Sequence, residues 1–437
     1  MVTTATGAAM RRIQAGNALS AFGLGFTVPY LYVYVAQVRN LGAGTAGAVL
    51  AVFALAALVV LPFTGRVIDR RGPLPVLVGG SVLAAVGALA MGLSGNVPAA
   101  VLSASVLGAG TAVLQPALAT MIVRCSTPAT RTRAFATQFF LANLGLGVGG
   151  LIGGLIVDTS RPGSFLLLFS VEAAMFLVLA AVAGSVRMPR PSGNGSGSAS
   201  VSASAGPSGM RALLRDRAMV RLCVLGFVLF FACYGQFESG LAAYSTEAAG
   251  LDPSMLGIAL AANTAVIVLA QFVVLRLVEP LKRSRVIAAV GLIWAFAWLL
   301  AGYAGLGHGS TTLATAALIS TYALFGLGEA MLSPTVAPLV ADLAPPSMVG
   351  QYNSGFALVK QLALAVGPAV GGPMGASLHA PYIVTFVLFS LGITVLALRL
   401  GRLLTPVQNQ PSLLTAGSRV VARHAPSEVS AERHAVR

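Results

Sequence analysis

Charged residues are scarce in this chain. Of its 437 residues only 9% are Asp, Glu, Lys or Arg, whereas 57% are hydrophobic. A soluble protein carries about 25% charged residues, which cover its surface. The composition therefore excludes an ordinary soluble globule and indicates that lipid is the solvent for most of the chain.

Cysteine, histidine and lysine are also few, and each shortage excludes a class of site. The three cysteines form no CxxC pair and the four histidines form no HExxH pattern, so we predict no disulfide framework and no metal site. Neither lysine, Lys282 or Lys360, follows a glycine, which excludes the GxxxxGK[ST] loop of an ATPase. An intramembrane serine protease built on GLSG at Gly92–Gly95 would need a histidine within a span, and no predicted span has one. We expect no enzyme and no cofactor.

Long apolar runs are what the chain has in abundance. Runs of about 20 residues with almost no charge are long enough to cross a hydrocarbon core of about 30 Å. Each run must be helical, because an open backbone in lipid leaves polar groups unpaired. We therefore predict an all-α integral membrane protein with twelve transmembrane helices: Asn17–Val38, Ala46–Thr64, Pro75–Leu93, Pro98–Val123, Phe135–Val157, Phe165–Val186, Met219–Ala242, Met255–Val278, Val286–Gly305, Ala314–Val336, Tyr352–Ala376 and Pro381–Leu400.

The basic residues indicate the orientation. If both termini are cytoplasmic, 24 of the 27 Lys and Arg lie in or next to the cytoplasmic segments, and only Arg39, Arg161 and Lys360 do not. This bias follows the positive-inside rule. Scattered charge of this kind suits anionic membrane lipids better than nucleic acid, so we expect lipid and no nucleic acid as a partner. The composition, rich in Ala, Gly, Val and Arg, points to a GC-rich bacterium and hence to a bacterial inner or plasma membrane.

A segment rich in Gly and Ser divides the spans six and six. Residues 192–209 read SGNGSGSASVSASAGPSG, which is typical of a flexible linker. We predict an N-terminal six-helix bundle over 1–186, a flexible cytoplasmic linker over 187–217, a C-terminal bundle over 218–402 and a disordered cytoplasmic tail over 403–437.

The two halves repeat. With an offset of 218 residues, LGAGTAVLQPALA at 107 meets FGLGEAMLSPTVA at 325, and LGLGVGGLIGG at 144 meets LALAVGPAVGG at 362. Six helices per repeat bring both halves into the membrane in the same direction. The halves are therefore parallel repeats, related by an axis along the membrane normal, with a central cavity expected between them.

A charged loop lies between the second and third spans. It reads GRVIDRRG, with Gly65, Asp69, Arg70 and Gly72 in the spacing of a glycine, three residues, Asp-Arg, one residue and a glycine. This resembles the loop motif of the major facilitator superfamily. The glycines of the fifth span resemble the pattern of the superfamily's export branches, the drug:proton antiporters. The chain departs from that pattern in several places: Gly150 stands where the fifth-span pattern has a proline, Ala104 stands where proton-linked members often carry an arginine, and the first span has no acid.

The resemblance implies a gating role for this loop. Asp69 is then expected beneath the cytoplasmic start of a second-half helix, the eleventh span, where a helix N-terminus attracts a carboxylate. Arg70 would hold Asp69 or pair with a helix end, and Gly65 and Gly72 would allow a close backbone approach. The alternative is a charge cluster with no partner, but the positive-inside rule by itself needs no acid.

Small residues at a spacing of four form a smooth stripe on the fifth span and on its repeat copy. Such stripes let helices meet tightly, with either plain packing or a sliding contact as their role. The packing glycines are Gly145, Gly149, Gly153, Gly367 and Gly371.

Ionisable groups within a membrane are functional candidates by default. Our candidates for proton coupling are Glu329, Glu238 and Lys360, whereas Glu172 in the sixth span suits a structural role better. Polar side chains on both halves suit a wet cavity, although each one taken alone is as consistent with helix packing. The substrate-cavity candidates are Tyr30, Gln115, Asn143, Tyr234, Gln236, Asn263, Gln271 and Gln361.

Together these features predict a secondary active transporter that works by alternating access. The resemblance implies efflux of small, partly hydrophobic organic compounds such as drugs or antibiotics in exchange for protons, by a monomer. A solute importer or uniporter of the same fold is the main alternative. A non-transporting receptor or scaffold is disfavoured, because polar groups are buried in both halves.

Overall fold

A computed structural model describes residues 2–27, 30–158, 161–186, 210–237, 239–252, 254–306 and 310–413. All regular structure in these ranges is helical. Most of the predicted linker, residues 187–209, and the tail from 414 onward lie outside them, as does Glu238.

The first bundle holds the predicted spans one to six. Its elements are α1 (Val2–Thr27), α2 (Leu31–Val33), the π-helix η2 (Tyr34–Val38), α3 (Gly42–Arg71), α4 (Pro73–Leu93), α5 (Val97–Arg124), α6 (Pro128–Ile156) and α7 (Pro162–Gly184). The first span is thus made of α1 together with α2 and η2, rather than of one continuous helix, and α1 begins well before the predicted start of the span.

The second bundle holds spans seven to twelve. Its elements are α8 (Met210–Arg215), α9 (Arg217–Ala232), α10 (Gly240–Glu247), α11 (Ser254–Val278), α12 (Arg283–Ala304), α13 (Thr311–Leu332), α14 (Val336–Leu343), α15 (Val349–Ser377), α16 (His379–Gly401) and α17 (Pro406–Asn409). Span seven is broken between α9 and α10. The short helices α8 and α17 fall within the predicted linker and tail, where Leu213 and Asn409 are buried.

Twelve spans result from these elements. Ten helices in the described ranges are each long and apolar enough to cross a membrane, with α13 and α14 counted as one. The bent pair of α1 with α2 and η2 makes an eleventh span. Helices α9 and α10 lie where the sequence predicts the remaining span, the seventh. Large apolar side chains such as Leu155, Leu269 and Leu151 are 88%, 80% and 73% exposed on the outside of the helices, where hydrocarbon is their natural solvent.

Capping residues explain where several helices begin. The Asn96 side chain accepts a hydrogen bond from the backbone N–H of Ala99 at the start of α5, and Asp216 accepts hydrogen bonds from Ala218 and Met219 at the start of α9. Both residue types are favoured at this position because they satisfy otherwise unpaired N–H groups.

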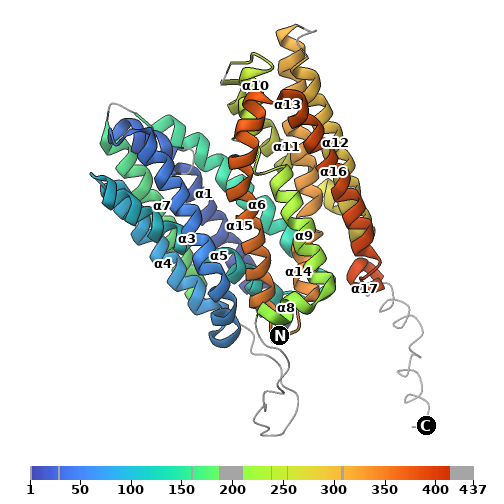
Figure 1. The fold of residues 1–437 in the computed structure, drawn as a ribbon. Helices are drawn as coiled ribbons and strands as arrows, with labels where there is room; N and C mark the ends of the chain where they lie inside the picture. The colour runs from blue at the N-terminus through green and yellow to red at the C-terminus, as the bar shows by residue number, and fades with distance from the viewer. Residues whose placement is uncertain are drawn as a thin grey trace, which may run out of the picture.

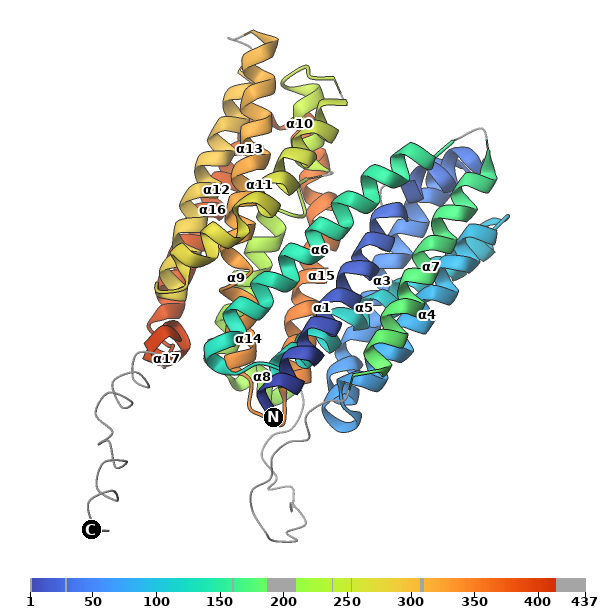
Figure 2. The ribbon, with the colours of Figure 1, turned by 180° about the vertical axis from the view of Figure 1, so that it is seen from behind.

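The helices form two bundles that lie side by side (Figures 1 and 2). They approach each other most closely at the end where α3 and α5 finish and α15 begins. There α3 packs along α15. We call this end the basic end, because it carries Arg70, Arg71, Arg124, Arg131 and Arg283. Helix α6 contacts α11 farther into the molecule, for example at Phe140 and Phe272.

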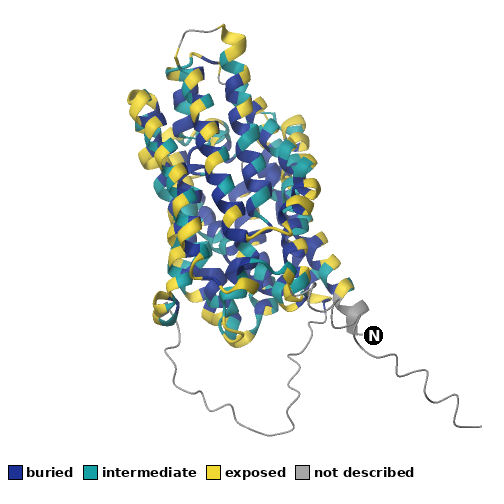
Figure 3. Cartoon of the chain, turned by 90° about the vertical axis from the view of Figure 1, so that its right-hand side faces the viewer, coloured by how far each residue is buried: buried dark blue, intermediate teal, exposed yellow. Residues whose placement is uncertain are grey.

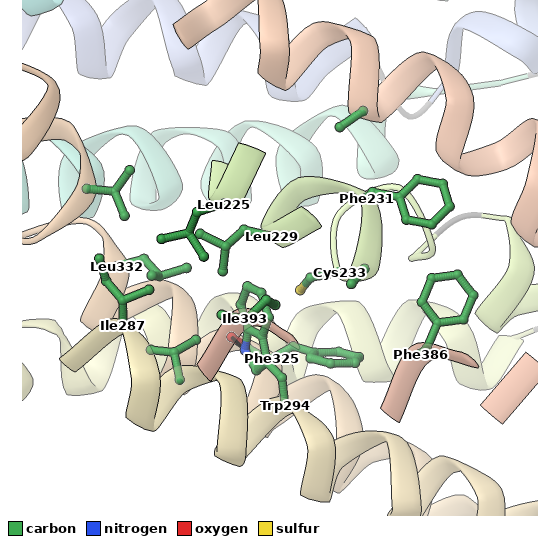
Figure 4. Packing of buried hydrophobic residues seen from close by; sticks show 14 of the residues in the cluster. Leu225, Leu229, Phe231, Cys233, Ile287, Trp294, Phe325, Leu332, Phe386 and Ile393 are labelled. Carbon is green, nitrogen blue, oxygen red and sulfur yellow. Dashed lines mark hydrogen bonds between the residues drawn. The ribbon is translucent and has the colours of Figure 1, made fainter. Parts of the chain in front are cut away.

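Buried residues run through the interior of the molecule, and exposed residues lie on its outside (Figure 3). The second bundle has the larger core, in which the Trp294 ring meets Phe325 edge-on at 6.0 Å between ring centres, with Phe386 and Ile393 in the same cluster (Figure 4). This rigid core supports the helices that carry the candidate site.

Candidate functional site

A buried carboxylate lies in the second bundle where α13 meets α11. Glu329 is 3% exposed, and Asn263 Nδ2 donates a hydrogen bond to its Oε1 at 2.9 Å. Asn263 also donates to the backbone oxygen of Tyr322 at 3.2 Å, which fixes its orientation. Gly326 makes this contact possible, since a Cβ there would lie 2.5 Å from the backbone oxygen of Asn263.

Lys360 lies on the other side of this carboxylate, on α15. Its Nζ is 5.0 Å from the ring centre of Phe230 and 5.8 Å from that of Tyr234, and its charge interacts with Glu329. The Tyr234 hydroxyl interacts with the Glu329 carboxylate. In the described ranges no carboxylate lies within 4.0 Å of the ammonium, so lysine and glutamate attract each other without direct contact.

Asn263, Glu329, Tyr234 and Lys360 together form what we call the polar network. Its members come from α11, α13, the α9–α10 turn and α15. Lys360 is the twelfth residue of α15, about 16 Å along the helix from its first residue at about 1.5 Å per residue. The network therefore lies near mid-membrane, where an ionisable group is expensive and its neighbours decide its charge.

The break in span seven brings Tyr234 into the network. The backbone N–H of Gly235 donates to the Phe230 oxygen at 2.8 Å, and that of Gln236 donates to the Cys233 oxygen at 2.9 Å, so the turn leaves few polar groups unpaired. Gly235 meets Gly367 of α15 so closely that a Cβ on Gly367 would lie 2.7 Å from the Gly235 Cα. Unwound backbone inside a membrane is tolerated where protein surrounds it in this way.

At the basic end, Asp69 bridges the two bundles. Its carboxylate accepts hydrogen bonds from the backbone N–H of Gly350 at 2.7 Å and of Gln351 at 3.1 Å, and from the Gln351 side chain at 3.0 Å. These N–H groups belong to the first turn of α15, the helix start at which the family resemblance places Asp69. A Cβ on Gly65 would lie 2.6 Å from the Gln351 Cα, so a residue without a side chain is needed for this approach.

The other two residues of the loop motif have different surroundings. Arg70 is exposed, and the cation that interacts with Asp69 is Arg124 at the end of α5. Gly72 follows α3 with φ at +88°, a backbone conformation that favours glycine.

A second bridge joins the bundles beside the first. Asp342 of α14 pairs with Arg131 of α6 and, at 2.7 Å, with Arg283 of α12. Arg283 also donates to the backbone oxygen of Gln408 at 3.0 Å, and Asn409 Oδ1 accepts a hydrogen bond from the Ser284 N–H at 3.0 Å. We call the segment 405–410, which includes α17, the C-terminal clasp.

Asp342→Asn is expected to destabilise the protein by about 3 kcal/mol, because two largely buried guanidinium groups lose their counter-charge. The measurement is thermal unfolding of the purified protein. Asp158→Asn is the matched control, since its pairing with Arg161 is solvent-exposed and contributes below about 1 kcal/mol. Equal unfolding temperatures for the two variants would contradict this role of Asp342.

The remaining cavity candidates differ in their surroundings. Gln236 and Gln271 are fully buried. The Gln236 side chain donates a hydrogen bond to the backbone oxygen of Phe231 and accepts one from the Tyr382 hydroxyl. The Gln271 side chain donates a hydrogen bond to the backbone oxygen of Ala330. The Tyr30 hydroxyl donates a hydrogen bond to the backbone oxygen of Gly150. The Asn143 side-chain amide donates one to the backbone oxygen of Phe139. Gln115 is exposed and Gln361 is half-buried. None of these side chains takes part in the polar network.

The glycine stripes lie in helix contacts. On α6, Gly145, Gly149 and Gly153 face the backbone of α1 at Ala18, Phe22 and Phe26. In the second bundle, Gly367 and Gly371 of α15 face the broken part of span seven at Gly235 and Gln236.

The comparisons with known proteins agree with this architecture. The model of the Major Facilitator Superfamily matches residues 15–254 and 241–430. The chain belongs to the Major Facilitator Superfamily. Its fold is the superfamily's twelve-helix fold, and both fold and family are those of a transporter.

Individual members of the superfamily are distant from this chain. Multidrug resistance protein MdtH of Aeromonas hydrophila is 27% identical over 412 residues, which cover 89% of this chain and 94% of that protein. Multidrug resistance protein 2 of Bacillus subtilis is 23% identical over 393 residues. The matched region covers 88% of this chain and 94% of that protein. A crystal structure of a bacterial homologue of the iron transporter ferroportin, in an outward-facing state, superposes with a TM-score of 0.73 at 14% identity, over 90% of this chain and 99% of that one.

Sequence reasoning missed the second bridge in this superfamily member. Arg131 and Arg283 entered the sequence analysis only as flanking basic residues, and Asp342 was not considered. One signal was available: Asp342 lies 218 residues after Arg124, the offset of the internal repeat. Arg124 interacts with the acid of the first bridge, and Asp342 is the acid of the second.

Proposed function

We propose that this chain exports small, partly hydrophobic organic compounds in exchange for protons, as a monomer in the plasma membrane of a bacterium. The names of its relatives, multidrug resistance proteins over nearly the full length of the chain, support the substrate class. The concentration of arginine at the basic end supports a cytoplasmic position for that end and for both termini.

The polar network is the observation that carries proton coupling. Glu329 is buried, and its bonding partner Asn263 has an amide that can donate to a carboxylate or accept from a carboxylic acid. When Glu329 takes up a proton, its attraction for Lys360 is lost. The ammonium, held over two aromatic rings, is then free to change partners. Protonation thereby changes the charge of the site at mid-membrane.

The two bridges support alternating access. Asp69 and Asp342 both join the bundles at the basic end, so this end is closed in the conformation described. Opening it requires both carboxylates to leave their partners while the bundles rock about the midplane. The smooth glycine contact between α6 and α1 lets helices shift against each other without interlocking side chains.

Expression of the gene in a bacterial host stripped of its own efflux pumps is expected to raise the inhibitory concentration of several partly hydrophobic compounds at least fourfold. A protonophore is expected to remove the difference, because export then lacks its driving force. The measurement is a growth-inhibition panel with and without the gene. Hypersensitivity would instead favour import, and unchanged growth over the whole panel would contradict drug export.

A further inference from the structure

A second buried acid lies in the first bundle, far from the polar network in sequence and on a different set of helices. Glu172 of α7 is 1% exposed. Neither of its carboxyl oxygens makes a well-formed hydrogen bond among the described residues, although the Thr27 hydroxyl interacts with the carboxyl group. No other buried carboxylate in the described ranges has both oxygens unpaired in this way.

The surroundings of Glu172 offer no counter-charge. Helices α1 and α4 pack against α7. Helix α1 has no ionisable side chain after Arg12, α4 has none, and Glu172 is the only one on α7. The Thr27 hydroxyl, which interacts with the carboxyl group, also donates to the backbone oxygen of Leu24 at 3.5 Å.

An ionised carboxylate in such a place would cost several kcal/mol, because it is buried away from solvent, no cation lies near it on the helices packed against it, and its one polar contact is a neutral hydroxyl. A carboxylic acid avoids most of that cost. We propose that Glu172 is a second proton-binding site, occupied in the conformation that is closed at the basic end and emptied when that end opens. The proposal rests on the proton coupling proposed above and adds a site in the other bundle.

Release of the proton follows from where Glu172 is placed. A Cβ on Gly23 of α1 would lie 3.2 Å from the Glu172 Cα, so the backbone of α1 directly covers the acid. The opposite side of α1 rests on the glycine stripe of α6, and α1 ends at Thr27 beside Glu172. A shift of α1 during the cycle therefore uncovers the carboxyl group, and water then stabilises its charged form.

A purely structural role explains Glu172 less well. A buried acid with no counter-charge and no well-formed hydrogen bond stabilises a helix contact no better than an apolar residue of similar size, and it is often worse. The glutamate differs from such a residue in only one respect, its ability to bind and release a proton.

Infrared spectroscopy tests whether the proton is present. In the full-length Glu329→Gln protein, which lacks the other proposed proton site, we expect a carbonyl band of a protonated carboxyl group near neutral pH. The further change Glu172→Gln is expected to remove that band, whereas Glu247→Gln, at an exposed acid on α10, is expected to leave it. A spectrum unchanged by Glu172→Gln would overturn the proposal.

The distance between the bundles tests release without any substrate. Spin labels at Arg71→Cys and Leu281→Cys, both exposed at the basic end of different bundles, report the ratio of closed to open molecules. In the Glu329→Gln background we expect this ratio to rise as pH falls, by up to about tenfold per pH unit, because the closed form binds one more proton. Adding Glu172→Gln is expected to remove this dependence. The same dependence in both proteins would overturn the proposal, whatever the outcome of the transport assays.

Discussion

Glu329→Gln is expected to reduce proton-gradient-driven transport in proteoliposomes to background while substrate binding is retained. Glutamine matches the protonated acid in size and keeps the hydrogen bond with Asn263, but it can neither take up nor release a proton. Residue 329 is then permanently neutral. The electrostatic attraction between this residue and Lys360 is absent throughout the transport cycle. The measurements are uptake driven by a pH gradient and equilibrium binding of a compound from the growth panel.

Glu247→Gln is the matched control for this experiment. It makes the same chemical change at an exposed position and is expected to transport at the wild-type rate. Full gradient-driven transport by Glu329→Gln would remove this residue from the mechanism. Glu238 and Glu172 would then be the next acids to test, and full transport by Glu238→Gln and by Glu172→Gln as well would contradict proton coupling.

Asp69→Asn is expected to slow transport at least tenfold with normal membrane insertion. The carboxylate accepts three hydrogen bonds at the start of α15, and asparagine offers one neutral oxygen and an NH₂ group that faces other donors. A loss of about 3 kcal/mol is reasonable for hydrogen bonds to a charged group. It would shift the balance between closed and open molecules on the order of a hundredfold, at tenfold for each 1.4 kcal/mol.

The measurement is the initial transport rate, normalised to the amount of protein in the membrane. Asp252→Asn is the control, because Asp252 is an exposed acid that accepts a hydrogen bond from the Ser254 N–H and is not part of either bridge. A wild-type rate for Asp69→Asn would show that the first bridge does not govern opening.

The fold could be predicted because the membrane leaves few choices. Apolar runs of sufficient length must be helices, and the offset of 218 residues sets two parallel halves side by side. The predicted spans differ from the structure only in local features, such as breaks within a span. Nothing in the sequence around Cys233 distinguishes a broken span from a continuous one, and the break is stabilised by Gly235 against Gly367, two residues far apart along the chain.

The candidate site was predictable as a set of residues but not as an arrangement. Glu329 and Lys360 were identified because charge is expensive inside a membrane. Their relation depends on Tyr234 and Asn263, which come from two further helices, and sequence spacing gives no distance between helices. Glu172 was predicted to have a structural role, and its burial without a counter-charge could be seen only once α1 and α7 were packed together.

The C-terminal clasp has a consequence for how the protein is made. Gln408 and Asn409 are translated after all twelve spans, and they complete the hydrogen bonds around Arg283 and the Ser284 N–H at the start of α12. The surroundings of Arg283, and with them the second bridge, therefore remain unfinished until residues 405–410 have been synthesised. A nascent chain that stops short of this segment is expected to insert every helix and still lack a firmly closed basic end.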